Sequence, residues 1–442
     1  MRFKISLFAA SLAFLLSACA TLPYPKIEGA MRQGQFHEAA EVVKGAEKEY
    51  GDKARLLYLM DRAMTLHLDG DYKASNLAIE EGSKLVDALY TTSVSSEVES
   101  LLVNDMSLPY RGDNYERVML HVLGMLNYAA LGSRDDAMVE AHQADEQLKA
   151  YAQEMGPDKV GYREDALARY LSAVLYEGGS RQELWDAYLD YKKADEAFDL
   201  YGKLYQTPKP MRLKTDLQRL AQGLGEQADL EAYRQRDSPL NFTPLSETRK
   251  DRAELVVLLY DGLAPAKQSE AMHLPIRLAD GTEQYFSMAL PKIVVDPTMA
   301  PQAVLQLSNG QSAPFELYQD VNAIAARDLQ DKAAGLIVKA TARALVKFQA
   351  ARAVQKKARE AGGGAELLAF LGTNIYNLVS EQADIRSWRT LPGRILLARL
   401  AVNPGKQHPQ ISISSPAPSR LVDLGEVNLK PGQKLFLQRA IY

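Results

Sequence analysis

The chain of 442 residues contains one cysteine, Cys19, and two tryptophans. A single cysteine excludes an internal disulfide, so a stable fold must rely on its buried core. An excess of positive charge is also missing, because 52 Lys and Arg stand against 56 Asp and Glu, a formal net charge of −4. Nucleic-acid-binding proteins are usually strongly basic, so this class is not expected. Hydrophobic residues make up 47% of the chain, enough for a sizeable core, and the length suggests two or three domains.

Motifs for catalysis and metal binding are missing too. The six histidines have no zinc-site spacing; they are His37, His67, His121, His142, His273 and His408. His37-Glu38-Ala39-Ala40-Glu41 lacks the second histidine of H-E-x-x-H, and Gly223-Leu224-Gly225-Glu226-Gln227-Ala228 spells G-x-G-x-x-A without a preceding strand, which favours a simple helix break. There is no G-x-S-x-G elbow and no G-x-x-x-x-G-K loop. We therefore expect no enzyme activity, no metal and no cofactor.

The amino terminus has the pattern of an export segment. Arg2 and Lys4 precede twelve uncharged residues, 5–16. A positive start followed by a short apolar run is typical of a secretory signal peptide. As a helix this run would cover about 18 Å, too little for the roughly 30 Å of a bilayer core. Residues 1–18 are therefore predicted to direct export and then to be removed, which leaves a mature chain of formal charge −6.

Leu16-Ser17-Ala18-Cys19 resembles the bacterial lipobox, in which the cysteine is acylated and becomes the first residue after cleavage. That resemblance implies a lipid anchor on Cys19, with acyl chains such as palmitate buried in the membrane. Ala20 stands where lipoproteins retained in the inner membrane carry Asp, which implies the outer membrane, on its periplasmic face. The alternative is ordinary signal cleavage at Ala18-Cys19-Ala20, which would release a soluble protein. Residues 19–26 are expected to form a lipidated tether.

Residues 27–236 have a helical pattern throughout and contain a repeat. Gly34-Gln35-Phe36 recurs 36 residues later as Gly70-Asp71-Tyr72, and Leu131-Gly132 begins a third copy. In each copy small residues follow at helical spacing; they include Ala39, Ala40, Ala74, Ser75, Ala137, Ala141 and Ala144. This pattern resembles the tetratricopeptide repeat (TPR), a helical pair of about 34 residues. The half is therefore predicted to be an all-α, TPR-like solenoid.

Solenoids present a long concave surface, so this half is expected to bind a protein partner. The alternative is that it serves only as a spacer or a dimerisation module. An aromatic series could contribute to a binding groove, although at helical spacing such residues more often belong to the core. The series comprises Tyr176, Trp185, Tyr188, Tyr191, Phe198, Tyr201 and Tyr205.

A proline-containing linker, residues 237–252, separates this half from a region with strand patterns, residues 253–442. Asp280-Gly281 and Asn309-Gly310 mark hairpin turns, and Pro404-Gly405 and Pro431-Gly432 mark later turns. We predict an α+β domain, an antiparallel β sandwich with a helical hairpin inserted at residues 320–384. The whole chain is then multidomain.

The first helix of this insertion is basic. Residues 321–361 contain nine Lys or Arg against three Asp or Glu, a local charge of +6. Lys339, Arg343 and Lys347 are candidates for contact with an anionic polymer, an acidic partner or phosphate headgroups. The alternative is a solvated face that the acidic remainder of the chain balances. Gly362-Gly363-Gly364 is predicted to end this helix and to allow a second one, residues 367–384, to fold back.

Two C-terminal stretches carry a further resemblance: Glu254-Leu255-Val256-Val257 with Gly262-Leu263-Ala264-Pro265, and Ala383-Asp384-Ile385-Arg386-Ser387-Trp388-Arg389-Thr390-Leu391-Pro392. Together with the helical first half they resemble a bacterial lipoprotein family that has a TPR-like half, an R-S-W-x-T-L-P segment and no assigned activity. The resemblance implies an envelope protein acting alongside lipoproteins that activate peptidoglycan synthases, and it carries over no catalytic residue. Arg386, Trp388 and Arg389 suit either a binding hot spot or a helix–sheet junction in which Trp388 is packed and the arginines bind carboxylates or helix-end carbonyls.

Three functions are weighed. The first is a lipid-anchored periplasmic scaffold or adaptor that binds envelope protein partners, attached to the outer membrane through Cys19. The second is a component of surface-polysaccharide or polymer assembly or export, in which Lys339, Arg343 and Lys347 meet an anionic polymer. The third is an unrecognised cell-wall hydrolase, which would need a cleft with two inward carboxylates of raised pKa.

Overall fold

The computed structural model describes residues 22–91, 105–155, 161–277, 281, 283–295, 300–361, 383–414 and 419–442. The predicted signal peptide, Cys19 and most of the predicted second helix of the insertion lie outside this set. Of residues 367–384 only Ala383 and Asp384 are described, and neither is helical.

The N-terminal half is helical, as the sequence predicts. Its α-helices are α2 (Tyr24–Arg32), α3 (Phe36–Gly45), α4 (Glu47–Tyr50), α5 (Arg55–Asp69), α6 (Tyr72–Thr91), α8 (Asn114–Ala130), α9 (Arg134–Met155), α10 (Ala166–Tyr176), α11 (Arg181–Tyr205), α12 (Met211–Leu224) and α13 (Gln227–Asp237). Short 3-10 turns lie at η1 (Asp52–Ala54) and η3 (Asp105–Ser107). Consecutive helices pack in pairs, α2 on α3, α5 on α6, α8 on α9 and α10 on α11.

Glycines at the repeat positions let the chain reverse between the helices of a pair. Gly34, Gly70 and Gly132 follow the first helix of three pairs and adopt φ of +71°, +85° and +74°. A side chain at such a φ is strained, so glycine is favoured where a helix ends and turns back. The small residues that follow allow close packing, because Ala39 and Ala137 are fully buried. Gly225, at φ +86°, ends α12, as expected for a helix break in the G-x-G-x-x-A stretch.

The predicted linker is more ordered than its composition suggests. It contains a helix, α14 (Leu245–Lys250). Leu245 and Thr248 are buried, and Leu245 packs so closely over α12 that a Cβ on Gly223 would lie 2.7 Å from Leu245 Cδ2. The missing side chain of Gly223 therefore allows this segment to lie against the helices.

The C-terminal half is rich in sheet, again as predicted. Its strands are β1 (Ala253–Leu263), β2 (Ala266–Arg277), β3 (Glu283–Val294), β4 (Gln302–Leu307), β5 (Ser312–Pro314), β6 (Glu316–Asp320), β7 (Pro392–Val402), β8 (Gly405–Gln407), β9 (Pro409–Ser414), β10 (Arg420–Asp423), β11 (Val427–Leu429) and β12 (Lys434–Ile441). They form two four-stranded sheets, β12-β1-β7-β6 and β10-β9-β4-β5, and two two-stranded pairs, β2-β3 and β8-β11.

The predicted antiparallel β sandwich differs from the structure at one edge. β12 pairs with β1 in parallel, in a register that joins Glu254 to Lys434 and Asp261 to Ile441. β7 pairs with β1 antiparallel on its other side. A parallel pair needs a long connection, which the roughly 170 residues between β1 and β12 supply, but the sequence pattern of a strand is the same for both directions.

Both faces of β1 are buried, which explains its uninterrupted apolar sequence. Leu255, Val257 and Leu259 belong to a core that lies between the two four-stranded sheets and includes residues of β4, β7 and β9. Val256 and Tyr260 point to the opposite face and belong to the core shared with the helices. That second core contains residues from α2 through α12 and from β1 and β7, so it continues without a break from the helical half to the sheet.

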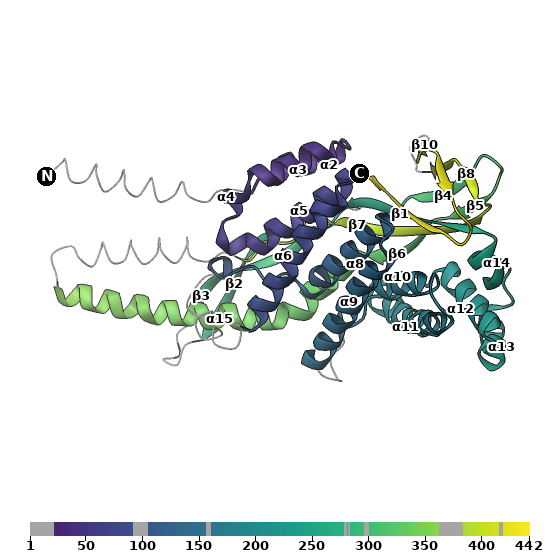
Figure 1. The fold of residues 1–442 in the computed structure, drawn as a ribbon. Helices are drawn as coiled ribbons and strands as arrows, with labels where there is room; N and C mark the ends of the chain where they lie inside the picture. Colours follow the sequence, from purple (N-terminus) through teal and green to yellow (C-terminus); the bar gives the residue numbers. More distant parts are fainter. Residues whose placement is uncertain are drawn as a thin grey trace.

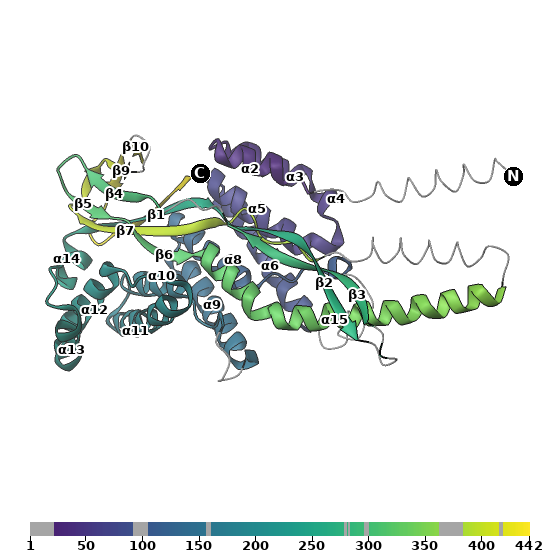
Figure 2. The same ribbon diagram turned by 180° about the vertical axis from the view of Figure 1, so that it is seen from behind.

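The remaining long element is α15 (Val321–Ala361), the predicted basic helix. With 41 residues it is about 60 Å long. Its first part lies beside β3 and β7, and its C-terminal part extends past the other helices and strands of the described chain (Figures 1 and 2). No helix in the described ranges is long and apolar enough to cross a membrane.

Candidate functional site

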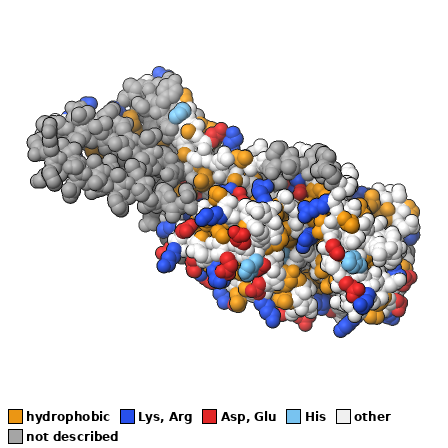
Figure 3. All heavy atoms as spheres, turned by 90° about the horizontal axis from the view of Figure 1, so that it is seen from above, with side chains coloured by type: hydrophobic (Ala, Val, Ile, Leu, Met, Phe, Trp, Pro, Cys, Tyr) orange, Lys and Arg blue, Asp and Glu red, His pale blue; other side chains and the backbone are white. Residues whose placement is uncertain are grey.

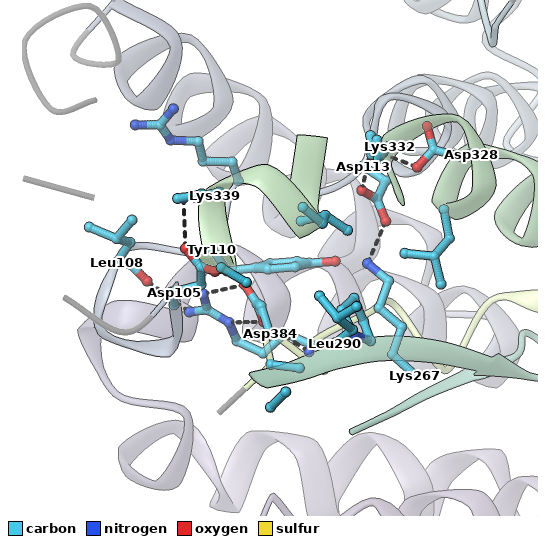
Figure 4. Close-up of a pocket in the computed structure, with 18 of the residues that line it drawn as sticks. Asp105, Leu108, Tyr110, Asp113, Lys267, Leu290, Asp328, Lys332, Lys339 and Asp384 are labelled. Atoms are coloured by element: carbon cyan, nitrogen blue, oxygen red, sulfur yellow. Dashed lines mark hydrogen bonds and ion pairs between the residues drawn. The ribbon is translucent and has the colours of Figure 1, made fainter. Parts of the chain in front are cut away.

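A cavity of about 730 Å³ lies between α15, the β2-β3 pair and two connecting segments, residues 105–113 and 383–386. Figure 4 shows that charged side chains from all of these segments point into it or line its rim. We call it the α15 cavity. Three of the residues selected from the sequence, Lys339, Arg343 and Arg386, line it together. Lys347, Trp388 and Arg389 do not line it.

Asp105 brings the two basic residues of α15 together. Its Oδ1 accepts hydrogen bonds from Lys339 Nζ at 2.7 Å and from Arg343 Nη2 at 3.0 Å. Burial would raise the pKa of Asp105, but the two cations outweigh it and lower that pKa. Arg343 is itself only 3% exposed. Part of the positive charge predicted for a solvated or polymer-binding face is therefore neutralised within the fold.

A second charged group lies at the opposite side of the cavity. Asp113 accepts hydrogen bonds from Lys267 and Lys332, both at 2.7 Å, and Lys332 also binds Asp328 at 2.6 Å. Burial would raise the pKa of Asp113, but the charges of the two lysines hold it well below its usual range. Burial and the neighbouring charge of Asp113 raise the pKa of Asp328 to about 6. Asp113 and Asp328 thus differ in proton affinity, because Asp113 pairs with two lysines and Asp328 pairs with one.

Glu116 adds a third carboxyl behind this group. Burial and the charge of Asp113 raise its pKa to about 7. Its oxygens accept hydrogen bonds from the backbone N–H groups of Asp113 and Trp388, at 2.7 and 2.8 Å, and from the hydroxyl of Tyr110. As the N3 residue of α8 it forms a capping box with Asp113. Glu116 does not line the α15 cavity, whereas Asp328 does. The cavity therefore does not contain both of these carboxyls of raised pKa.

Arg386 fastens the two connecting segments to each other. Its guanidinium donates to the carbonyl oxygens of Lys53, Leu108 and Asp105 at 2.9 to 3.1 Å, and to the Asp384 carboxylate at 2.6 Å. The segment 105–108 therefore owes its position to a side chain nearly 280 residues further along the chain. Such a set of carbonyl contacts uses the planar fork of arginine, which lysine lacks.

Trp388 is a packing residue, since it is 1% exposed and belongs to the core that joins helices and sheet. Its Nε1 donates to Thr390 Oγ1 at 3.0 Å, and Thr390 in turn donates to the buried Asp61 at 2.7 Å. Asp61 also accepts from Tyr24 and Tyr50. Burial raises the pKa of Asp61 to about 6, although these hydrogen bonds oppose the rise.

Arg389 has a different environment. Its guanidinium pairs with Glu28 at 2.5 Å and lies over the ring of Tyr24, 4.4 Å from the centroid. The side chain therefore ties the R-S-W-x-T-L-P segment to α2, the first described helix. The aromatic series of the helical half is also mostly internal, because Tyr188, Tyr191, Phe198, Tyr201 and Tyr205 are buried while Tyr176 and Trp185 are half-buried.

The sequence did not reveal the most highly charged part of the interior. Three buried acids and four basic residues form an ionic cluster between α10, α12 and the sheet: Glu177, Asp216, Glu254, Arg212, Arg219, Arg399 and Lys434. Arg399 Nη2 lies 2.5 Å from Glu177 and 2.8 Å from Glu254. The available signal was a lone charge within an apolar strand, as at Glu254 in β1 and Arg399 in β7, because a strand buried on both faces accepts a charge only with a partner.

The α15 cavity is mixed in character. Six cationic side chains and four carboxylates line it, together with apolar groups that include Leu108, Tyr110, Leu290 and Leu336. A surface of this kind can hold a chain segment that carries both apolar and charged side chains.

Among the residues that the structure describes, no group of three or more His, Cys, Asp or Glu is arranged to hold a metal ion. No family model, curated protein or solved structure matches this chain.

Proposed function

We propose that this chain is a lipid-anchored periplasmic scaffold or adaptor that binds a protein partner of cell-envelope assembly at the α15 cavity. The lipobox at Cys19 supports the anchor and its place on the outer membrane, facing the periplasm. The observation that carries the partner site is the convergence of Lys339, Arg343 and Arg386 on one cavity that also offers apolar walls. Protein segments present this combination of groups, whereas a uniform polymer does not.

For the fold we propose the finer description that the sequence predicts. The paired helices of the first half form a TPR-like array, which the positive φ of Gly34, Gly70 and Gly132 supports. The two four-stranded sheets form a sandwich-like domain, which their shared apolar core supports. We also propose that the chain belongs with the lipoproteins that its R-S-W-x-T-L-P segment resembles.

In-cell crosslinking tests the partner site. A photo-reactive phenylalanine analogue replaces Leu336, which lines the cavity, in the full lipidated chain. The matched control is Val338, which is 69% exposed on the same helix and does not line the cavity. We expect one partner protein to be captured from position 336 and not from position 338. Capture of the same proteins at both positions, or of none at position 336, contradicts the proposal.

The anchor has its own test. Mass spectrometry of the native protein should find acyl chains on Cys19, and Cys19→Ser should release the protein from the membrane fraction and abolish the crosslink at position 336. A protein with an unmodified amino terminus that is free in solution would instead indicate ordinary signal cleavage without a lipid anchor.

A role in polymer assembly or export is the second candidate. One observation favours it: beyond Arg343, residues 344–361 of α15 carry a net charge of +4, and the C-terminal part of this helix extends beyond the body (Figure 1). The described surface seen in Figure 3 carries acidic and basic side chains side by side, which argues against a broad polymer-binding face. The double variant K356Q/K357Q, two exposed lysines, should lose retention on immobilised alginate if the second candidate is right. Unchanged retention, or none in either protein, dismisses it.

A cell-wall hydrolase is the third candidate from the sequence. It needs a second inward carboxyl of raised pKa beside Asp328, and Glu116 is occupied with three hydrogen bonds outside the cavity lining. The adaptor therefore remains our conclusion.

A further inference from the structure

A second cavity, far from the first in sequence, lies between the start of α11, the end of α12 and α14. It has a volume of about 610 Å³, within the range that small ligands occupy. Its lining residues are Arg181, Leu184, Arg219, Gln222, Gly223, Leu224, Phe242, Pro244, Leu245, Ser246, Arg249 and Lys250. All of them belong to the described chain, and we call this feature the α14 cavity.

The charges of the α14 cavity have one sign. Four cationic side chains line it, and no carboxylate is found among its described lining residues. The carboxylates nearest to Lys250 in sequence, Glu247 and Asp251, do not line it. The α15 cavity differs in this respect, because its own carboxylates pair with most of its cations.

Three of the four cations remain available to a ligand. The guanidinium of Arg219 is used by Glu177 and Asp216 in the ionic cluster. Arg181 and Lys250 are exposed at the rim, and within the described ranges no carboxylate lies at ion-pair distance from either of them or from Arg249. Unpaired cations gathered at one cavity attract anions, and arginine forks suit phosphate and carboxylate groups in particular.

Arg249 is held in place by the fold. Its Nη2 donates to the carbonyl oxygen of Gly179, next to Ser180, which caps α11. The Arg249 contact therefore ties the first turn of this 25-residue helix to the cationic rim. Two elements, α11 and α14, therefore form the site, and the contact between Arg249 and Gly179 joins them. This contact fixes the position of one of the cations.

Apart from Arg219, whose charge is paired, the buried side chains of the cavity are apolar. Leu184 and Leu245 are buried, and Leu224 and Phe242 are half-buried beside them. Leu245 reaches this position because Gly223 has no side chain. A ligand that suits the α14 cavity therefore needs an anionic group at the rim and an apolar portion below it.

We propose that the α14 cavity is a binding site for a small ligand with a phosphate or carboxylate head and an apolar body. The site is independent of the adaptor function, because it shares no lining residue with the α15 cavity.

Calorimetric titration of the full chain with phenyl phosphate and with benzoate tests this proposal. Phenol, which lacks the charge, and inorganic phosphate, which lacks the ring, serve as control probes. We expect saturable binding of at least one of the two aromatic anions, tighter than that of phenol and of inorganic phosphate. Tighter binding of phenyl phosphate assigns a phosphate head, and tighter binding of benzoate assigns a carboxylate head. The absence of saturable binding by both overturns the proposal.

Charge-removing variants locate the binding. Lys250→Gln and Arg181→Gln should each weaken it by about tenfold, the loss expected for one charge-assisted hydrogen bond. Both residues are exposed, so the folded state should survive, which an unchanged thermal midpoint verifies. Lys73→Gln removes the same charge from an exposed site on α6 and should leave the affinity unchanged. An equal loss in Lys73→Gln and Lys250→Gln means general charge attraction and overturns the site.

Discussion

His67 shows what burial does to a single titratable residue. Its Nδ1 lies 2.6 Å from Asn127 Oδ1 and its Nε2 lies 2.9 Å from the hydroxyl of Tyr260. Because the amide oxygen can only accept, Nδ1 carries the hydrogen and Nε2 accepts from the tyrosine, which fits the neutral ring. Burial lowers the pKa of His67 to about 4. One residue of α5 thereby connects α8 to β1.

The pH dependence of stability follows from this shift. The unfolded chain binds a proton on His67 below about pH 6.5, while the folded chain resists it until about pH 4. The contribution of His67 is therefore complete above pH 6.5 and is lost as the pH falls towards 4, by up to about 3 kcal/mol. In His67→Gln this loss should vanish, so the stability difference from the native chain should shrink as the pH falls.

Urea unfolding at several pH values between about 7.5 and 4.5 measures this effect. The control is His142→Gln, an exposed histidine of α9, which leaves the contribution of His67 in place. Asp61 and Glu116 act in the opposite direction, because their raised pKa values make the folded chain hold protons as the pH falls. The difference between the two histidine variants removes that common background. A constant difference across the pH range would contradict the assigned protonation.

Arg399 pairs with all three acids of the ionic cluster. Arg399→Met leaves Glu177 and Glu254 with fewer cationic partners in a site without exposure. Loss of one partner from a buried ion pair costs about 3–5 kcal/mol, so we expect a large fall in the free energy of unfolding. Lys406→Met breaks an exposed pair with Glu426 and should have little effect. A loss in Arg399→Met no larger than in Lys406→Met would mean that the cluster contributes nothing.

At the scale of single residues, sequence reasoning found only part of the candidate site. Lys339, Arg343 and Arg386 were selected because they lie in a basic helix and a distinctive segment. Their partner Asp105 lies in a connection between helices, where no periodicity marks it. Tertiary contacts over more than 230 residues select that carboxylate, and one sequence does not reveal such pairs.

Secondary-structure elements were predictable where composition and periodicity agree. α15 begins one residue after the predicted start of the insertion at residue 320, and it ends directly before the predicted helix end at Gly362-Gly363-Gly364. The uninterrupted apolar run of β1 has the pattern of a strand buried on both faces. The parallel pairing of β12 and the helix α14 were missed, because strand direction and short helices depend on contacts with distant parts of the chain.

Gly335 and Gly70 test how the backbone conformation at a glycine affects the free energy of unfolding. Gly335 lies inside α15 with no atom within 4 Å of an added Cβ. Gly335→Ala should stabilise the protein by about 0.5–1 kcal/mol, because alanine has the higher helix propensity. Gly70 also has open space around it but adopts φ +85°. Gly70→Ala should therefore destabilise by about 1–2 kcal/mol.

Urea unfolding of both variants gives the two free energies directly. Since neither alanine meets a neighbour, the opposite signs report backbone conformation alone. Equal signs would show that the left-handed turn after α5 does not constrain the chain.

For the whole molecule, the shared core predicts how the protein unfolds. Helices α2 to α12 and strands β1 and β7 contribute to one buried cluster, which includes Trp388. Cooperative units that share so much core are expected to melt together. In Trp185→Phe the remaining tryptophan, Trp388, reports this junction.

Thermal unfolding of Trp185→Phe, followed by fluorescence and by far-ultraviolet circular dichroism, should give coincident transitions. Phenylalanine keeps most of the half-buried ring at position 185, so the substitution should leave the midpoint close to that of the native chain. Separate midpoints for the two signals would show that the helical half and the sheet unfold independently.

The parallel pairing of β12 with β1 also has a bearing on biosynthesis. The two strands are about 180 positions apart, so the ribosome completes β1 long before its neighbour exists. Until β12 has been synthesised, Glu254 lacks Lys434 and one side of β1 stays unpaired. Final assembly of this sheet must therefore wait until β12 has left the ribosome.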